Sequence, residues 1–390
     1  MLSNQVITSP RRGVWRDRPS RRKRVVLALL ALATILTGSY CLVSALVLFR
    51  VQEMTPPVLA AQLQERHGGL YGPAREVDLA AYKLERYGER RPDILVVGSK
   101  RLAALPGEAF AAPAYNAAGI ADTVGQLAAF VRAAVASHAP KSILIGVDYW
   151  WFHPDAVAAP APAAQRESFV GQLLDPLLWL LTGRVSLGEF VDGAFPTADA
   201  TPGIGALAML DGQGWDAYGR YEGGRSASAG ATEPSLARTL HVGPSAEALK
   251  ELNDLVAELN DRSIEVVLMI PPVSTSLHLA LARDADNRLL PLWRDALRAL
   301  GQKVFDFEDP SVLGATDCEL INDISGGEVI YLRALDAIGN YGGTSLSQGI
   351  DRDITTSLIG SNADHVRVAE LLPADAPTDI QFRSDCGKDK

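Results

Sequence analysis

The chain has 390 residues, 47% hydrophobic and 21% charged, which excludes a wholly disordered or collagen-like protein. Its net charge of −9 is uneven: residues 1–24 carry eight basic side chains and one acidic, a net +7, and the rest carries −16. A body this acidic repels a phosphate backbone, so nucleic acid is not expected as a partner.

Residues 25–49 contain no charged side chain and, at ~1.5 Å per residue, are long enough to cross a ~30 Å hydrocarbon core. We therefore predict a transmembrane helix with the lipid bilayer as its partner. The alternative is a cleaved signal peptide, whose apolar region normally has only ~7–15 residues. Because the basic arm of residues 1–24 precedes the helix and Arg50 alone follows it, the positive-inside rule places that arm in the cytoplasm. The prediction is a single-pass protein of the inner membrane with an exported, periplasmic C-terminal domain.

Residues 50–91 are predicted to form a helical stalk, because mixed charges lie on a partly apolar helical pattern. From residue 92 to about 340, short apolar runs alternate with amphipathic segments. The predicted strands are 93–97, 114–118, 142–147, 265–270 and 303–307, and the predicted helices are 122–137, 245–260, 288–300 and 327–338. Asp122 is the expected cap of the first helix. The alternation predicts an α/β domain of three layers, with a parallel sheet between helices.

An insertion at about 154–244 interrupts this alternation. It contains an apolar helix candidate at 168–181 and a glycine-rich end with Trp215, Tyr218 and Tyr221. These rings either form a platform for a carbohydrate or pin a long loop to the body, and the sequence favours the second interpretation. Residues 341–390 are polar and are predicted to be an irregular tail that wraps the surface or contacts a partner.

Cysteine usage agrees with export. Cys41 lies in the apolar segment, which leaves Cys318 and Cys386 outside it, as a disulfide or as two separate thiols. The six histidines are scattered without metal-ligand spacing, so no metal site is expected.

Ligands of an open parallel sheet bind beyond the carboxyl ends of its strands, so the residues that follow each predicted strand are the candidates for a site. There the blocks ILVVGSKR, YNAAGIADT, ILIGVDYWWF and NDISGGEVIYLR occur in this order. Together they resemble the four blocks of the SGNH (GDSL-like) hydrolase superfamily. The blocks specifically resemble those of its membrane-anchored members, such as alginate O-acetylation proteins and the D-alanyl transfer protein of teichoic acids.

The resemblance implies an SGNH-like, flavodoxin-like domain without a cofactor. It also implies two partners, a polytopic membrane-bound O-acyltransferase and an exported polysaccharide. The family's nucleophile position falls at Lys100, with Ser99 one residue early, and its oxyanion glycine falls at Gly119. Its oxyanion asparagine falls at Asp148, where a carboxylate repels the developing charge.

The fourth block of the family supplies an aspartate and a histidine, which fall at Asn322 and Ser325 in this chain. A shift by one residue restores Asp323 but offers Gly326 in place of the histidine. Neither register supplies a base, so the resemblance implies a degenerate triad.

Other side chains at the strand ends complete the set of candidates. Trp150, Trp151 and His153 are predicted to bind substrate, and His153, His278 and Asp306 are the residues from which a displaced catalytic site could be rebuilt. The leading hypothesis is a non-catalytic partner in O-acylation of an exported polysaccharide. The alternatives are an active acyl esterase or acetyltransferase that uses Ser99 on a cell-envelope glycan, and a structural protein of envelope assembly.

Overall fold

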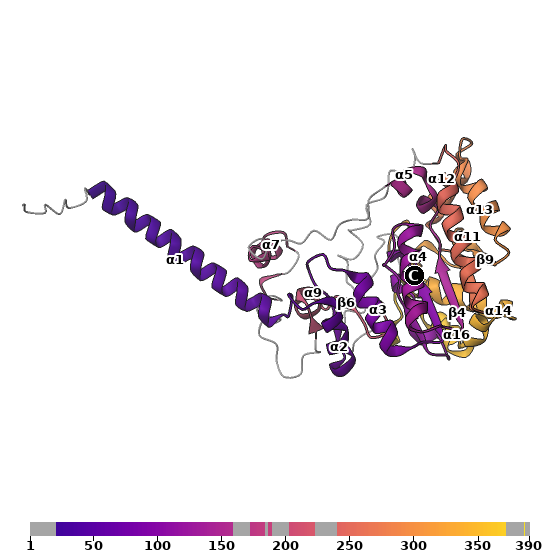
Figure 1. Ribbon diagram of the computed structural model, residues 1–390, viewed down its shortest axis with the longest axis horizontal. Coiled ribbons are helices and arrows are strands. Elements are labelled where there is room, and N and C mark those ends of the chain that lie inside the picture. The colour runs from indigo at the N-terminus through magenta and orange to yellow at the C-terminus, as the bar shows by residue number, and fades with distance from the viewer. Residues whose placement is uncertain are drawn as a thin grey trace, which may run out of the picture.

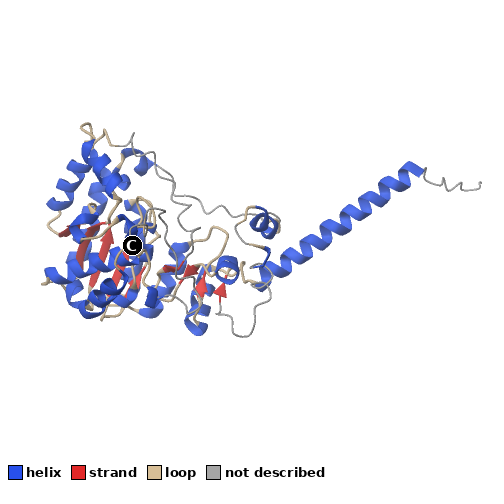
Figure 2. Cartoon of the chain, turned by 180° about the vertical axis from the view of Figure 1, so that it is seen from behind, coloured by secondary structure: helices blue, strands red, loops and turns tan. Residues whose placement is uncertain are grey.

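The computed structural model describes residues 21–158, 172–183, 186–188, 203–222, 240–371 and 386. A large α/β body and a smaller four-stranded sheet lie side by side, and one long N-terminal helix extends away from them (Figures 1 and 2). The predicted basic arm lies outside the described residues, except for its last four residues, which begin this helix.

The main sheet has five parallel strands in the order β3-β2-β4-β8-β9. Their bounds are β2 Ile94–Val97, β3 Ala114–Asn116, β4 Ser142–Gly146, β8 Glu265–Ile270 and β9 Lys303–Asp306. Counted along the chain this order is 2-1-3-4-5, which is that of flavodoxin-like doubly wound sheets. The inner strands are continuous apolar runs because both faces are covered.

Helices cover both faces of the sheet. Leu95, Ile143 and Leu268 face a core formed with α3 (Leu79–Arg90), α4 (Val124–Ser137), α11 (Ala246–Asp261) and α13 (Leu289–Ala299). The residues between them, such as Val96 and Leu144, face α14 (Glu328–Tyr341) and α15 (Ser345–Gly349). The predicted α/β fold with a parallel sheet is confirmed.

Three local predictions need correction. The cap of α4 is Thr123, whose hydroxyl accepts from the Gln126 amide, because Asp122 lies one residue too early. Helix α12 (Thr275–Arg283) was not predicted, although Ser274 caps it. The segment predicted as an irregular tail contains α15 and α16 (Arg352–Asn362), whose polar residues include the caps Thr344 and Asp351.

The small sheet joins the predicted stalk to the insertion. Its order is β5-β1-β6-β7, with β1 Leu70–Tyr71, β5 Gly203–Ile204, β6 Gly214–Trp215 and β7 Tyr221–Glu222. The stalk is helical, as predicted, in α2 (Pro57–His67) and α3. It does not stand apart from the body, however, because α3 contributes Tyr87 to the core beneath α4.

Helix α1 (Arg21–Arg50) is long and apolar enough to span a membrane. Its last turn is part of the folded body: Val47, Leu48 and Val51 pack against Trp179 of α7 (Asp175–Leu181) and Leu210 of α9 (Ala206–Asp211). The chain continues without a free linker, because the Val51 carbonyl accepts from the Gly205 amide at 2.8 Å. Beyond it, buried Glu53 accepts from the amides of Ala206 at 2.7 Å and Arg75 at 2.9 Å.

Candidate functional site

Ser99 and Lys100 lie at the carboxyl end of β2, where the sequence places the first catalytic block. Ser99 caps the short 3-10 helix η1 (Lys100–Ala104), and its buried hydroxyl accepts from the Arg101 amide at 3.3 Å. The Lys100 side chain is exposed. The residue at the family's nucleophile position therefore faces solvent, and the neighbouring serine serves as a cap.

The end of the sheet is closed by Arg101, which the sequence analysis did not single out. Its Nη1 donates to Asp148 Oδ1 at 2.6 Å, and its Nη2 donates to the carbonyls of Pro271 at 3.0 Å and Pro272 at 2.8 Å. Its Nε donates to the carbonyl of Ile324. Because Arg101 is 5% exposed, its guanidinium fills the space beyond β2, β4 and β8 and ties them to the loop before α14. We call this group the Arg101 clamp.

Asp148 is the acidic partner in the clamp and is 1% exposed. Burial raises the pKa of its carboxyl, and the charge of Arg101 and a hydrogen bond from Ser99 oppose that rise. The ion-pair partner of Asp148 is Arg101. Asp148 is thus a structural counter-ion at the position where the family has an oxyanion donor.

The Gly119 amide, which is the backbone donor expected to stabilise an oxyanion, is already bonded, and so is the side chain of nearby Asn116. Gly119 has φ +91°, a conformation that favours glycine, and its amide donates to the Gly98 carbonyl at 3.0 Å. The Asn116 amide group donates to the carbonyls of Leu102 at 2.9 Å and Leu105 at 3.1 Å. These donors hold loops together instead of facing a reacting atom.

The loop before α14 lies against the clamp but brings no histidine to it. Asn322 Oδ1 accepts from the amides of Ile324 at 3.0 Å and Ser325 at 2.8 Å, which closes a turn. The Ser325 carbonyl accepts from the Ile321 amide at 2.9 Å. The structure therefore brings Asn322 and Ser325 close to Arg101, through the Ile324 carbonyl, as parts of one turn.

The two candidate histidines have other partners. His153 Nδ1 accepts from the Asp155 amide at 3.2 Å at the start of α5 (Pro154–Ala158). His278 Nδ1 lies 3.0 Å from Glu308 Oε1, and the third candidate, Asp306, pairs with Arg294 at 2.8 Å. In the part of the chain that the structure describes, neither histidine bonds to Ser99, so a displaced triad is not formed.

The predicted substrate-binding tryptophans differ from each other in their surroundings. Trp151 is buried in the core, where it packs against other hydrophobic residues, and its role as a substrate contact stays a prediction. Trp150 is half-buried, with the Arg101 guanidinium 5.3 Å from its ring centre. The other neighbour of the Trp150 ring is Tyr149, which meets it edge to face with ring centres 5.0 Å apart.

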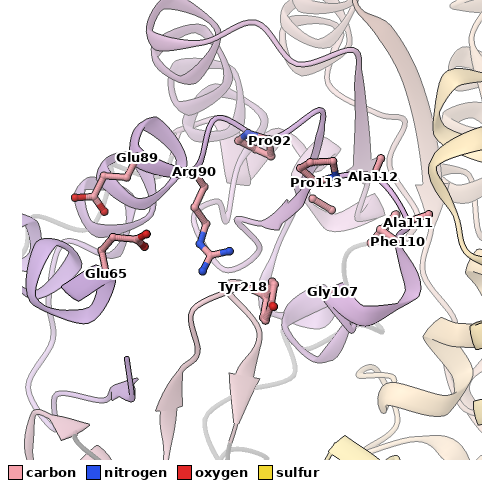
Figure 3. Close-up of a pocket in the computed structure, with 11 residues that line it drawn as sticks. Glu65, Glu89, Arg90, Pro92, Gly107, Phe110, Ala111, Ala112, Pro113 and Tyr218 are labelled. Carbon is pink, nitrogen blue, oxygen red and sulfur yellow. The ribbon is translucent and has the colours of Figure 1, made fainter. Parts of the chain in front are cut away.

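Two of the three insertion aromatics pin the small sheet to the body. Trp215 is buried beneath Lys83, whose ammonium lies 3.8 Å from the ring centre, and Tyr221 meets it edge to face at 4.9 Å. Tyr218 is 45% exposed and lines a cavity of about 530 Å³, with Arg90 4.9 Å from its ring centre (Figure 3). This cavity lies at the opposite end of the sheet from the clamp, because Pro92 and Ala114, at the starts of β2 and β3, line it.

Arg220 connects the β6–β7 hairpin to the main body. This nearly buried guanidinium lies 3.1 Å from Asp216, 2.9 Å from Glu222 and 3.5 Å from Glu328 on α14. Burial raises the pKa values of Glu222 and Glu328, and the charge of Arg220 opposes both shifts. One cation thus holds several carboxylates of separate segments together.

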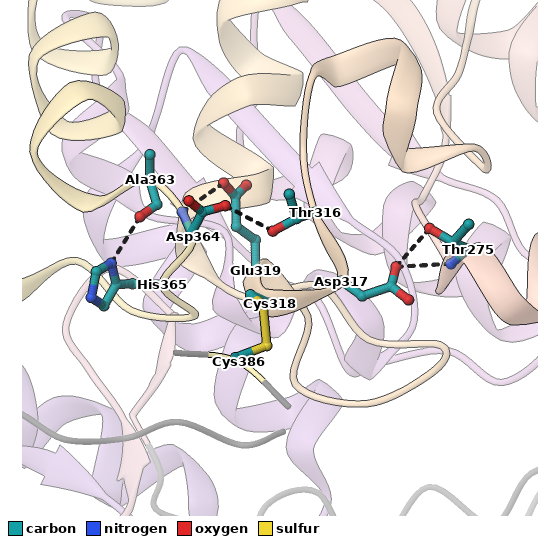
Figure 4. Close-up of a disulfide and its surroundings, with 9 residues drawn as sticks. All are labelled: Thr275, Thr316, Asp317, Cys318, Glu319, Ala363, Asp364, His365 and Cys386. Carbon is teal, nitrogen blue, oxygen red and sulfur yellow. Dashed lines mark hydrogen bonds between the residues drawn. A yellow bond between two sulfur atoms is a disulfide. The ribbon is translucent and has the colours of Figure 1, made fainter. Parts of the chain in front are cut away.

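Cys318 and Cys386 form a disulfide, which decides between the two alternatives that the sequence left open (Figure 4). Cys318 lies on the short helix η6 (Asp317–Glu319). On either side of it, Asp317 accepts from the Thr275 amide at 2.8 Å and Glu319 pairs with Arg333 at 2.9 Å. The bond therefore attaches the end of the chain to a well-anchored loop.

One group of side chains has the composition of a metal site. His241, Asp284 and Asp286 place one ligand atom each within 4.8 Å of one another. His241 and Asp286 are exposed, and spacing along the sequence gave no sign that they meet. The group lies on the surface, away from the strand-end residues described above.

Neither protein-family models nor curated protein sequences gave a match to this chain. The argument for function therefore depends on the chain's own motifs, fold and side-chain geometry. Of these, the Arg101 clamp is the feature that sequence reasoning missed, and its only signal was a second basic residue two positions after a predicted loop serine.

Proposed function

We propose that this protein is a membrane-anchored, exported SGNH-like protein that acts as a non-catalytic partner in O-acylation of an exported polysaccharide. The observation that carries the non-catalytic assignment is the Arg101 clamp, which fills the strand-end position with a fully bonded guanidinium. The polysaccharide and the membrane-bound O-acyltransferase enter this proposal through the resemblance of the four sequence blocks alone.

The site supports the loss of catalysis in two ways. A serine hydrolase needs a base within reach of its nucleophile, but Asp148, which bonds to the Ser99 hydroxyl, is paired with Arg101. The Gly119 amide, expected as an oxyanion donor, donates to a backbone carbonyl instead, and so does the nearby Asn116 side chain. Without triad and donors, only weak effects of binding remain for rate enhancement.

The end of α1 supports an anchor over a cleaved signal peptide. Val47, Leu48 and Val51 belong to a buried cluster of the body, so removal of the helix would expose the residues that pack on it. The disulfide supports an exported location, since such bonds persist in oxidising compartments. The basic residues before the helix support a cytoplasmic N-terminus.

Catalysis is tested with the purified full chain in detergent. Aryl-acetate hydrolysis and acetyl transfer to a glycan are measured for the wild type and for Ser99→Ala, with near-ultraviolet circular dichroism to show that both are folded. The expected result is that the two proteins give the same background rate. Turnover that disappears in Ser99→Ala would instead establish the active esterase or transferase.

The role in acylation is tested in the native host. Deletion of the gene is expected to lower the O-acetyl content of the exported polysaccharide, and both the wild type and Ser99→Ala are expected to restore it. Unchanged acetylation after deletion would contradict the proposal and favour a structural role in the envelope.

A further inference from the structure

Helix α7 has an apolar stripe that no part of the described chain covers. Leu174, Leu177, Leu178 and Leu181 follow the i, i+3, i+4, i+7 spacing of one helical face, and all four are exposed. The opposite face is different, because Pro176 and Trp179 are buried there. The helix is therefore apolar on both sides, and only one side is packed.

The position of α7 relative to α1 is fixed by contacts. Trp179 packs into the same cluster as Val47 and Leu48 of α1, and the Tyr40 hydroxyl donates to the Leu174 carbonyl at 3.4 Å. Figure 1 shows α7 beside the end of α1 that meets the body. The helix that carries the leucine stripe thus lies beside the end of α1 that meets the body, with its Trp179 face toward that end.

The length of α1 indicates where a bilayer would end. Twenty-five apolar residues at ~1.5 Å each exceed a ~30 Å hydrocarbon core by about five residues. About five apolar residues therefore lie outside the hydrocarbon core. We assign them to the last turns of α1, where Ser44, Val47 and Leu48 are buried in the body, because the stretch before these residues is exposed and can face lipid. Tyr40 then lies near the membrane surface, where tyrosine is enriched.

We propose that α7 lies in the outer interface of the membrane, with its leucine stripe inserted among the lipid acyl chains. This inference depends on the proposed anchor and extends it, since it gives the body a second contact with the bilayer. A short helix with an apolar face at the interface binds by burying that face to about 5–10 Å. The body would then rest on the membrane instead of standing off it.

A lipid surface fits the stripe better than a protein partner. The stripe carries no charged side chain and no groove, and two helical turns offer a partner helix little area. Helices α12 and α13 each expose a single large hydrophobic residue, Leu279 and Leu292, whereas Met54, Val58 and Leu59 are exposed soon after the end of α1. Because the exposed apolar residues of α7 are concentrated beside α1, we expect lipid to surround both α7 and α1.

The experiment measures lipid contact at single positions of the full chain. Cys41→Ser removes the free thiol and leaves the Cys318–Cys386 bond intact, and single cysteines are then introduced by Leu178→Cys and Leu292→Cys. These leucines are equally exposed, at 49% and 48%, so they form a matched pair. Each is labelled with an environment-sensitive fluorophore and reconstituted into liposomes that contain no other protein. Quenching is compared for lipids with a nitroxide near the headgroup and for aqueous iodide.

The expected result is nitroxide quenching several-fold stronger at position 178 than at 292, and the reverse order with iodide. Equal behaviour at the two positions would overturn the inference. Protection of position 178 in native membranes but not in protein-free liposomes would also overturn it, by identifying a protein as the occupant.

A third label at Leu36→Cys, in the exposed middle of α1, separates this inference from the anchor. This label is compared in lipids with a nitroxide deep in the acyl chain. Quenching at position 36 by that lipid, without headgroup-nitroxide quenching at 178, refutes the interfacial helix and leaves the anchor intact. No quenching at position 36 by the deep nitroxide refutes both.

Discussion

Arg101 is a cation in an almost dry environment, and the neutralising carboxylate of Asp148 and three backbone carbonyls make that placement possible. Taking both charges out of water costs several kcal/mol per ion, which their attraction and the added hydrogen bonds must offset. Loss of either partner should therefore destabilise the protein, because it leaves the other charge buried without a counter-charge.

Arg101→Met is expected to lower the free energy of unfolding by about 3–5 kcal/mol, since it leaves the Asp148 carboxylate buried alone. Urea unfolding of the full chain, followed by tryptophan fluorescence, measures the loss. The neighbouring Lys100→Met is the control, because an exposed lysine should change stability by less than about 0.5 kcal/mol. Equal losses in the two variants would show that the clamp is not a stabilising contact.

Asp148 makes stability depend on pH in a predictable direction. Its pKa in the folded protein is raised by burial above the ordinary value of about 3.9, so the folded state retains a proton that the unfolded state has lost. Its contribution to the free energy of unfolding is therefore fully present below pH about 4 and is lost as pH rises through the folded pKa.

Asp148→Asn lacks this contribution, so the variant should gain stability relative to the wild type between pH about 4 and 8. Denaturation curves of both proteins across this range measure the change. Asp309→Asn should show no such trend over this range, because hydrogen bonds from Ser311 lower the pKa of Asp309 and its contribution therefore changes only below pH about 4. A difference between Asp148→Asn and the wild type that does not vary with pH would contradict the argument.

The residues of the clamp show why a site is harder to predict than a sheet. In the sequence, Arg101 follows a loop serine and has the pattern of a solvated side chain. Its burial depends on carbonyls of Pro271, Pro272 and Ile324, more than 160 residues away along the chain. No local pattern records that these acceptors converge, whereas Ser99 and Asp148 were accessible as residues that follow apolar runs.

The β6–β7 hairpin is an element that could not hold its place alone, because each strand has two residues. Arg220 fixes it to α14 through Glu328 and to its own strands through Asp216 and Glu222. A single nearly buried cation among several carboxylates should be the most costly charge to remove from this region.

Arg220→Gln is expected to lower the free energy of unfolding by about 3–5 kcal/mol, because it leaves buried carboxylates without a counter-charge. Arg132→Gln is the matched control: that arginine also pairs with two glutamates but is 40% exposed, so about 1 kcal/mol or less should be lost. Thermal unfolding of the two variants compares them. A loss for Arg220→Gln no larger than that for Arg132→Gln would contradict the role of the buried cluster.

Among the elements, the sequence predicts those with a long hydrophobic pattern. It does not predict strands whose partners lie far away in the chain. The strands at Ile94–Val97 and Glu265–Ile270 were predicted because buried parallel strands are continuous apolar runs. The two-residue strands of the small sheet have no such pattern, and their pairing depends on segments far apart in the chain. Helices α15 and α16 were missed because short helices with many serine, threonine and aspartate residues resemble loops.

For the whole molecule, the Cys318–Cys386 bond closes a loop that contains α14, α15 and α16. Cys318→Ser together with Cys386→Ser should lower the free energy of unfolding by about 2–4 kcal/mol, because the unfolded chain regains the freedom of the open loop. Denaturation with and without a reductant measures this effect. The reductant should destabilise the wild type alone, and an equal effect on the double variant would mean that reduction acts elsewhere.

The hydrogen-bonded junction after α1 has a mechanical consequence. Val51 and Glu53 are bonded into the body, so there is no hinge at which the helix and the body could turn independently. The helix and the body are therefore expected to move as one rigid unit. Any neighbour that tilts the helix would displace the far end of the α/β body with it.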